Sequence, residues 1–218
     1  MVKIFVIFLA LQSFDEIYNA ANADRAAGRW GEALAGYTKL LEHFEKITAE
    51  NPEDAQAKSN LKQIKTDIAL TYFNQKNWAE SAKRFEELLG ADTKNVDYAY
   101  MAGKSWMELK RYPQSIGILQ QVIQARPDYL DAYGTLGSIF YIRQNWARAI
   151  EMFTKFIELK PGQAFAHFLL ASSHDKLGNI KDAALHYNKF LALDDGSNDI
   201  RSFQARQRLK TLERRLKK

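Results

Sequence analysis

The chain of 218 residues contains no cysteine, only 4 prolines and only 11 glycines. The absence of cysteine excludes structural disulfides and thiol chemistry, although it does not fix the compartment. The scarcity of proline and glycine argues against a disordered or collagen-like chain. No apolar run approaches the roughly 20 residues that a membrane-spanning helix needs. Apolar residues recur instead at helical spacings, so we expect an all-α protein.

The sequence repeats itself. Four bulky anchor residues are spaced 34 residues apart, and a fifth precedes the first of them by 34 plus 14 residues. These anchors are Trp30, Trp78, Tyr112, Trp146 and Ile180. Three positions after the anchors stand the small residues Ala33, Ser81, Ser115, Ala149 and Ala183. Seven positions after them stand the large residues Tyr37, Phe85, Leu119, Phe153 and Tyr187, and nine before them the small residues Ala21, Ala69, Gly103, Gly137 and Ala171. A period between 20 and 50 residues marks a solenoid, in which each repeat buries its apolar face only against its neighbours.

Each repeat reads as two helices. In residues 130–163, one apolar stripe is centred on Leu136 and Phe140 and a second on Ala149 and Phe153, with Gln144 and Asn145 between them. Pro127 and Pro161 mark places where one helix ends before the next begins. We expect Gly137 and Ala149 to face each other, which allows two antiparallel helices to approach closely.

These columns resemble the tetratricopeptide repeat, a 34-residue helix-turn-helix unit whose arrays wind into a right-handed superhelix. The match covers residues 14–197, and the fourth repeat carries the signature Tyr133, Leu136, Gly137, Phe140, Ala149, Phe153 and Pro161. The resemblance implies an all-α, right-handed α-solenoid of antiparallel helix pairs. Its five repeats would cover residues 14–61, 62–95, 96–129, 130–163 and 164–197, followed by a basic capping helix over 198–218.

The first repeat contains the 14 additional residues. No helix breaker occurs from Glu32 to Glu50, and Asn51 and Pro52 offer a cap and a first-turn proline for a second long helix. We therefore expect about seven residues in excess on each of two adjacent helices, a hairpin that projects by about 10 Å. It is either a neutral length variant or a knob on which a partner docks.

Residues 1–13 combine Lys3 with an apolar run from Ile4 to Leu11, the order found in a secretory signal peptide. We expect them to be a signal peptide, which implies an exported product, periplasmic or secreted. The alternative is an apolar segment that covers the first repeat, in which case the protein is cytoplasmic.

The basic charge of the chain lies at its carboxyl end. Residues 201–218 hold eight Lys or Arg against the single Glu213. A stripe of Phe203, Leu209, Leu212 and Leu216 predicts a helix that caps the solenoid and exposes a basic face. That face is either a solvated surface or a weak contact site for an acidic partner or a membrane surface. A nucleic acid is disfavoured because no aromatic residues are interleaved with the basic ones.

No catalytic, cofactor-binding or metal site is evident. Ser173, His174 and Asp175 are the residue types of a catalytic triad, but consecutive helical residues do not face each other. His167 and His174 lie seven residues apart at packing positions of the repeat, so we interpret them as core or interface histidines. We expect a protein that is not an enzyme.

The resemblance places the binding surface on the first helix of each repeat, which lines the concave groove. The positions that match the family's groove positions and that we select as partner-binding are Tyr18, Asn22, Arg25, Phe73, Asn74, Tyr100, Lys104, Met107, Tyr141, Phe168 and Ser172. Aromatic side chains with few charges suit an apolar or extended peptide segment. The predicted function is an interaction scaffold that binds a protein or peptide, with a chaperone-like holdase or envelope accessory factor and a cytosolic adaptor as alternatives.

Overall fold

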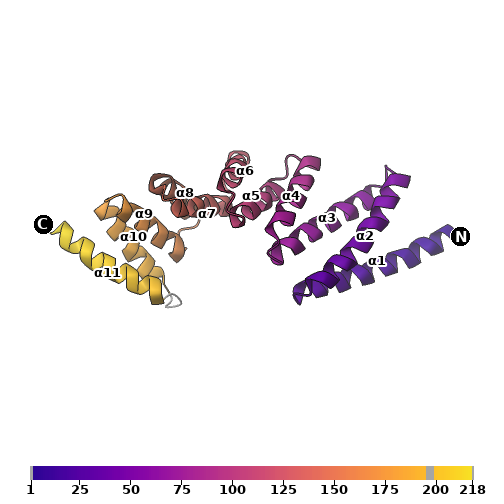
Figure 1. Cartoon of the computed structure of the whole chain (residues 1–218), viewed down its shortest axis with the longest axis horizontal. Coiled ribbons are helices and arrows are strands. Elements are labelled where there is room, and N and C mark those ends of the chain that lie inside the picture. Colours follow the sequence, from indigo (N-terminus) through magenta and orange to yellow (C-terminus); the bar gives the residue numbers. More distant parts are fainter. Residues whose placement is uncertain (1, 195–198, 218) are drawn as a thin grey trace. The chain divides into compact units, whose positions relative to one another are not determined.

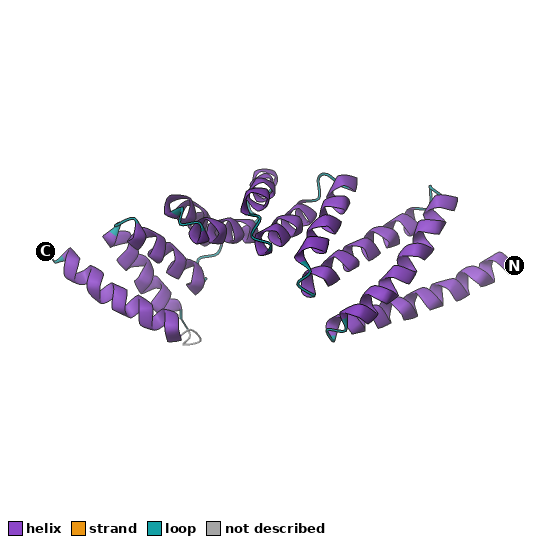
Figure 2. Ribbon diagram, viewed as in Figure 1, coloured by secondary structure: helices purple, strands orange, loops and turns teal. Residues whose placement is uncertain are grey.

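The computed structural model describes the backbone of residues 2–194 and 199–217, and the side chains of residues 14–194 and 200–217. The described elements are all α-helices (Figures 1 and 2). They are α1 (Val2–Ala26), α2 (Trp30–Glu50), α3 (Ala55–Asn74), α4 (Trp78–Ala91), α5 (Val96–Glu108), α6 (Tyr112–Ala125), α7 (Leu130–Ile142), α8 (Trp146–Leu159), α9 (Ala164–Lys176), α10 (Ile180–Leu193) and α11 (Asp199–Leu216). The predicted fold class, an all-α solenoid of helix pairs, is confirmed.

The chain divides into two compact units. Unit 1 covers Met1–Arg111 and contains α1 to α5, and unit 2 covers Tyr112–Lys218 and contains α6 to α11. Within each unit, helices that follow one another in the sequence pack side by side, as α1 with α2 and α9 with α10 do.

The anchor residues of the repeat mark one structural position. Each of them is the first residue of α2, α4, α6, α8 or α10. The small residues three positions later are all fully buried, and so are the large residues seven positions later, with at most 3% exposure. The repeat period therefore identifies the inward-facing side of the second helix in every pair.

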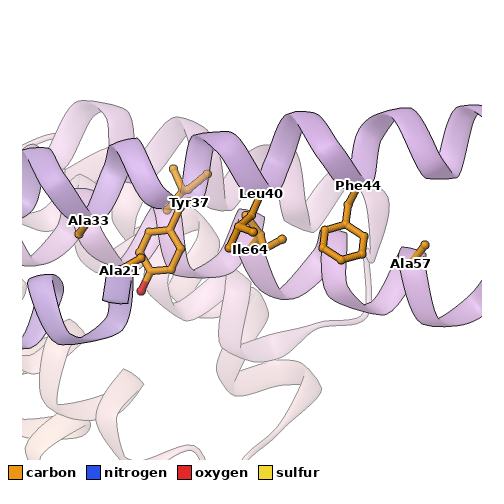
Figure 3. Close-up of a cluster of buried hydrophobic side chains, with 8 residues drawn as sticks. Ala21, Ala33, Tyr37, Leu40, Phe44, Ala57 and Ile64 are labelled. Atoms are coloured by element: carbon orange, nitrogen blue, oxygen red, sulfur yellow. The ribbon is translucent and has the colours of Figure 1, made fainter. Parts of the chain in front are cut away.

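The core of unit 1 follows the inner side of the long helix α2. Tyr37, Leu40 and Phe44 point from α2 toward Ala21 of α1 and Ile64 of α3 (Figure 3). Helices α2 and α3 contain 21 and 20 residues, whereas α4 and α5 contain 14 and 13. The additional turns carry buried side chains and so extend the core.

The turn between α2 and α3 differs from the prediction. Asn51 and Pro52 do not begin the second helix, because Asn51 caps the end of α2 through its backbone N–H to the carbonyl of Ile47. Helix α3 begins at Ala55, where the carboxylate of Asp54 accepts a hydrogen bond of 2.8 Å from the backbone N–H of Ala57. An aspartate at the N-cap satisfies a backbone donor that has no partner within the helix.

The residue that Gly137 faces in the contact between α7 and α8 also differs from the prediction. A Cβ atom on Gly137 of α7 would lie 2.8 to 3.0 Å from three ring atoms of Phe153 on α8. Gly137 therefore faces the Phe153 ring, whereas we expected it to face Ala149. The missing side chain makes room for a large ring rather than for a second small residue.

The capping helix α11 packs on α10 in a register that the apolar stripe did not predict. Leu212 is fully buried as expected, but Phe203 and Leu216 are 62% and 44% exposed. Ser202 and Ala205 are buried in their place. The expected signal peptide falls on residues whose side chains lie outside the described part, although α1 runs through Val2–Ala26. Among the described residues, no helix is both long and apolar enough to cross a bilayer.

Candidate functional site

A pocket of about 360 Å³ lies among α7, α9, α10 and α11 of unit 2. It brings together Tyr141, Phe168 and Ser172, all of which the sequence predicted as groove residues. The other lining residues are Asp175, Lys176, Tyr187, Gln204 and Arg208. We regard this pocket as the candidate binding site.

The aromatic wall of the pocket is fixed by its neighbours. The hydroxyl groups of Tyr141 and Ser172 share a hydrogen bond of 2.9 Å. The Tyr141 ring packs edge-on against Trp146, with 5.3 Å between centroids. Phe168 packs edge-on against Tyr187 at 5.9 Å. Because several contacts hold these rings, a ligand can bury area on them at a small cost in side-chain entropy.

One ion pair bridges α9 and α11 at the pocket. The Nε and Nη2 atoms of Arg208 donate to the two carboxylate oxygens of Asp175 at 2.7 and 2.6 Å. This hydrogen bonding raises the pKa of Arg208. Burial, followed by the charge of Asp175, raises the pKa of Tyr187 to about 12, so its hydroxyl stays protonated. The charge of Asp175 is thus balanced by that of Arg208. The ammonium group of Lys176 then makes the rim of the pocket positive.

Two predicted groove residues of unit 1 bind Asp67 of α3, which is 2% exposed, and a third, Asn22, binds one of them. The Tyr18 hydroxyl donates to Asp67 at 2.8 Å, and Nη1 of Arg25 does so at 2.6 Å. The Asn22 side-chain oxygen accepts from Nη2 of Arg25 and from the Tyr37 hydroxyl. Tyr18, Asn22 and Arg25 therefore join α1 to α2 and α3, a structural role that competes with partner binding.

The remaining predicted residues of unit 1 lie on α3 and α5. The Lys104 ammonium group lies 5.2 Å from the Phe73 ring centroid and 5.8 Å from that of Tyr100. Asn74 is exposed at the end of α3, and Met107 is half-buried on α5. The structure thus brings Phe73, Tyr100 and Lys104 together through cation–π contacts.

A second pocket, of about 270 Å³, lies among α2, α3 and α4. Its lining contains none of the predicted groove residues and consists of Leu41, Glu45, Lys65, Ile68, Arg84, Glu87, Leu88 and Ala91. Nζ of Lys65 and a carboxylate oxygen of Glu45 are 3.2 Å apart at this pocket. Its charges pair with one another, so they do not select a ligand of one sign.

Three histidines form a cluster between α9 and α10. The Nδ1 atoms of His167 and His186 are 3.0 Å apart, and the His174 ring lies parallel to His186. Nε2 of His167 is 3.1 Å from the carbonyl oxygen of Pro161. In neutral rings, Nε2–H of His167 must donate to that carbonyl, so its Nδ1 accepts from Nδ1–H of His186. Among the described side chains, no group of three or more His, Cys, Asp or Glu has a geometry that could hold a metal ion.

The histidine cluster is expected to make the folding of unit 2 sensitive to acid. Burial lowers the pKa of His167, His174 and His186, that of His186 to about 4. The charge of Lys189 lowers the pKa of His186 further, and the charge of Asp182 opposes this shift. The unfolded chain, with histidine pKa values near 6.5, then binds more protons than the folded chain as the pH falls. The stabilising contribution is complete above about pH 6.5 and is lost progressively toward about pH 4.

Urea unfolding at pH 7.5 and at pH 5 measures this dependence. The variant His186→Gln should lose part of the difference between the two pH values. His43→Gln, at an exposed histidine of α2, should retain all of it. An equal pH dependence in His186→Gln and in the unmodified chain would show that the cluster contributes nothing.

Comparisons with known proteins identify the repeat. The tetratricopeptide repeat family model matches residues 66–129 and 135–198, more than half of the chain. No curated protein matches the sequence. MamA 41-end from Desulfovibrio magneticus RS-1 is similar in structure, with a TM-score of 0.68, 19% identity, and coverage of 85% of this chain and 97% of that one.

A second similar structure is YrrB, described as a TPR protein with an unusual peptide-binding site. It has a TM-score of 0.66 and 20% identity, and the alignment covers 88% of this chain and 90% of that one. At these identities the similarity concerns the fold. Together with the match of the family model over most of four helix pairs, it shows that the chain belongs to the tetratricopeptide repeat family.

Proposed function

We propose that the protein is a non-enzymatic interaction scaffold that binds a peptide segment of a partner protein in the pocket of unit 2. The observation that carries this proposal is the convergence of Tyr141, Phe168 and Ser172 in one pocket. Tetratricopeptide repeat proteins are generally scaffolds, and the similar structure YrrB is described as having a peptide-binding site. The wall suits an apolar side chain, and the positive rim at Lys176 favours an acidic residue beside it.

Tyr141 is the expected anchor of the bound peptide. A crosslinking pull-down from the native host supplies the partner, and calorimetry with the bound segment measures its affinity. Tyr141→Ala should weaken binding by about 2 kcal/mol, roughly 30-fold, because an aromatic anchor loses its buried area. Tyr141→Phe retains the ring and should lose less, since only the hydrogen bond to Ser172 is removed.

Ile142→Ala is the matched control for Tyr141→Ala. Ile142 is the next residue on α7, is 57% exposed, and is not among the residues that line the pocket. Its truncation should leave the affinity unchanged. A loss of folding stability in Tyr141→Ala as large as its loss of affinity would instead assign Tyr141 to the packing against Trp146. A pull-down with many weak partners would favour the holdase.

We further propose that the scaffold acts in an exported compartment. The support is the order of Lys3 and the apolar run from Ile4 to Leu11. The intact mass of the protein purified from its host for the pull-down tests this proposal. A mass that lacks roughly the first 13 residues supports export. A full-length mass with cytosolic partners contradicts it and favours the adaptor.

A further inference from the structure

Helix α11 exposes two large apolar side chains that its packing does not explain. Ile200 and Phe203 are 74% and 62% exposed, the highest values among the exposed large apolar residues of the described chain. They are three residues apart, so they are neighbours on one helix face. The buried residues Ser202, Ala205 and Leu212 belong to the opposite side, which packs against α10. The apolar pair thus faces away from the unit.

Cationic side chains continue the same face toward the carboxyl end. Lys210 follows Phe203 by seven residues and Arg214 by eleven, which places both close to the helix line that starts at Phe203. Arg206 lies beside them, and all three are exposed. Residues 201–218 contain only one acidic residue, Glu213, against eight basic ones. Arg208, by contrast, is turned toward Asp175 at the pocket.

We propose that this outer face of α11 docks onto an anionic lipid bilayer. Ile200 and Phe203 enter the boundary between headgroups and acyl chains, while Arg206, Lys210 and Arg214 contact lipid phosphates. A helix that lies in the interface combines an apolar edge with a basic face, and both terms contribute to its affinity. α11 packs chiefly on α10 (Figure 1), and its exposed apolar residues lie on the other side of the helix.

The chemistry of the face selects a bilayer over other acidic partners. A nucleic acid would gain from several stacking rings, whereas Phe203 is the only aromatic residue of α11. An acidic protein segment would pair with the cations but would leave Ile200 in water. A bilayer with negative headgroups accommodates both kinds of side chain at once. This inference does not depend on the peptide pocket, which α11 lines with Gln204 and Arg208.

Co-sedimentation of the full chain with phosphatidylglycerol vesicles tests the proposal. We expect binding to these vesicles, at least tenfold weaker binding to phosphatidylcholine vesicles, and a loss of at least tenfold when salt rises from 0.1 to 0.5 M. The last effect follows because exposed charges are screened within a few ångströms at high salt. The triple variant Arg206→Glu, Lys210→Glu, Arg214→Glu should bind at least tenfold more weakly, and Phe203→Ala several-fold more weakly.

The matched control reverses three exposed lysines of unit 1, Lys58→Glu, Lys83→Glu and Lys94→Glu, which gives the same change in net charge. It should bind as the unmodified chain does if α11 is the docking surface. Equal losses in both triple variants would mean that only net charge matters and would overturn the proposal. Retained binding in the α11 variant would also overturn it, as would tighter binding of poly-glutamate or RNA than of the vesicles.

Discussion

Replacing Asp67 with alanine is expected to lower the free energy of unfolding of unit 1 by about 3–5 kcal/mol. Asp67 is 2% exposed, and its carboxylate accepts hydrogen bonds from Tyr18, Arg25 and Gln63. Its removal leaves the Arg25 guanidinium, itself only 23% exposed, without its acidic partner. Breaking a buried pair from one side is costly because the remaining charge has lost both water and counterion. Urea unfolding, together with hydrogen exchange in α1 and α3, measures the loss in the free energy of unfolding.

Glu45→Ala is the matched control in the same unit. Glu45 pairs with Lys65 at 3.2 Å, but the two side chains are 50% and 44% exposed. An exposed pair contributes about 0–1 kcal/mol, so this change should have little effect. Replacing Asp67 and Arg25 together with Leu and Met removes both charges and should recover much of the loss. If Asp67→Ala cost no more than Glu45→Ala, the network around Asp67 would not stabilise the unit.

The helical architecture could be predicted because it repeats. A small residue that recurs at multiples of 34 positions reports the same environment each time, so Ser81, Ala149 and Ala183 each indicate one buried contact that the others corroborate. Trp78 and Trp146 likewise occupy one position of the repeat, and each is the first residue of a helix. Nearest-neighbour packing converts this one-dimensional pattern directly into a fold.

Interactions that occur only once in the chain left no such signal. Asp67 is 42 residues from Arg25 and 49 from Tyr18. These spacings do not predict that three helices meet at Asp67. The same holds for Arg208, whose pairing with Asp175 depends on the rotation of α11 about its own axis. A shift of one residue in that rotation is about 100°, enough to expose Phe203 where burial was expected.

The sequence predicted which residues a groove would present, but not which of them are already bound by neighbouring side chains. The repeat specifies which positions a first helix presents, and this brought Tyr141 and Ser172 to one pocket. The repeat does not show which of these side chains are already hydrogen-bonded to a neighbour, as Tyr18 and Arg25 are to Asp67. The lining by Gln204 and Arg208 was missed because α11 lies outside the repeat.

Phe153→Ala should lower the free energy of unfolding of unit 2 by about 3–5 kcal/mol, since it removes a fully buried ring and leaves a cavity. Gly137→Ala in the unmodified chain should be destabilising by about 1–3 kcal/mol, because its Cβ would lie 2.8 Å from that ring. In the Phe153→Ala background the clash is gone. The same Gly137→Ala change should then stabilise α7 by about 0.5–1 kcal/mol, the gain expected for alanine over glycine inside a helix.

The reversal of sign separates steric contact from helix propensity. Gly117 lies inside α6, and a Cβ added there would meet no atom within 4 Å. Gly117→Ala should therefore stabilise by about 0.5–1 kcal/mol whether or not Phe153 is present. Urea unfolding of the unmodified chain, the three single variants and the two double variants gives both coupling energies. An effect of Gly137→Ala with the same sign and size in both backgrounds would show that the Phe153 ring yields to the new methyl group. The small-residue column of the repeat would then reflect helix packing in general rather than this ring.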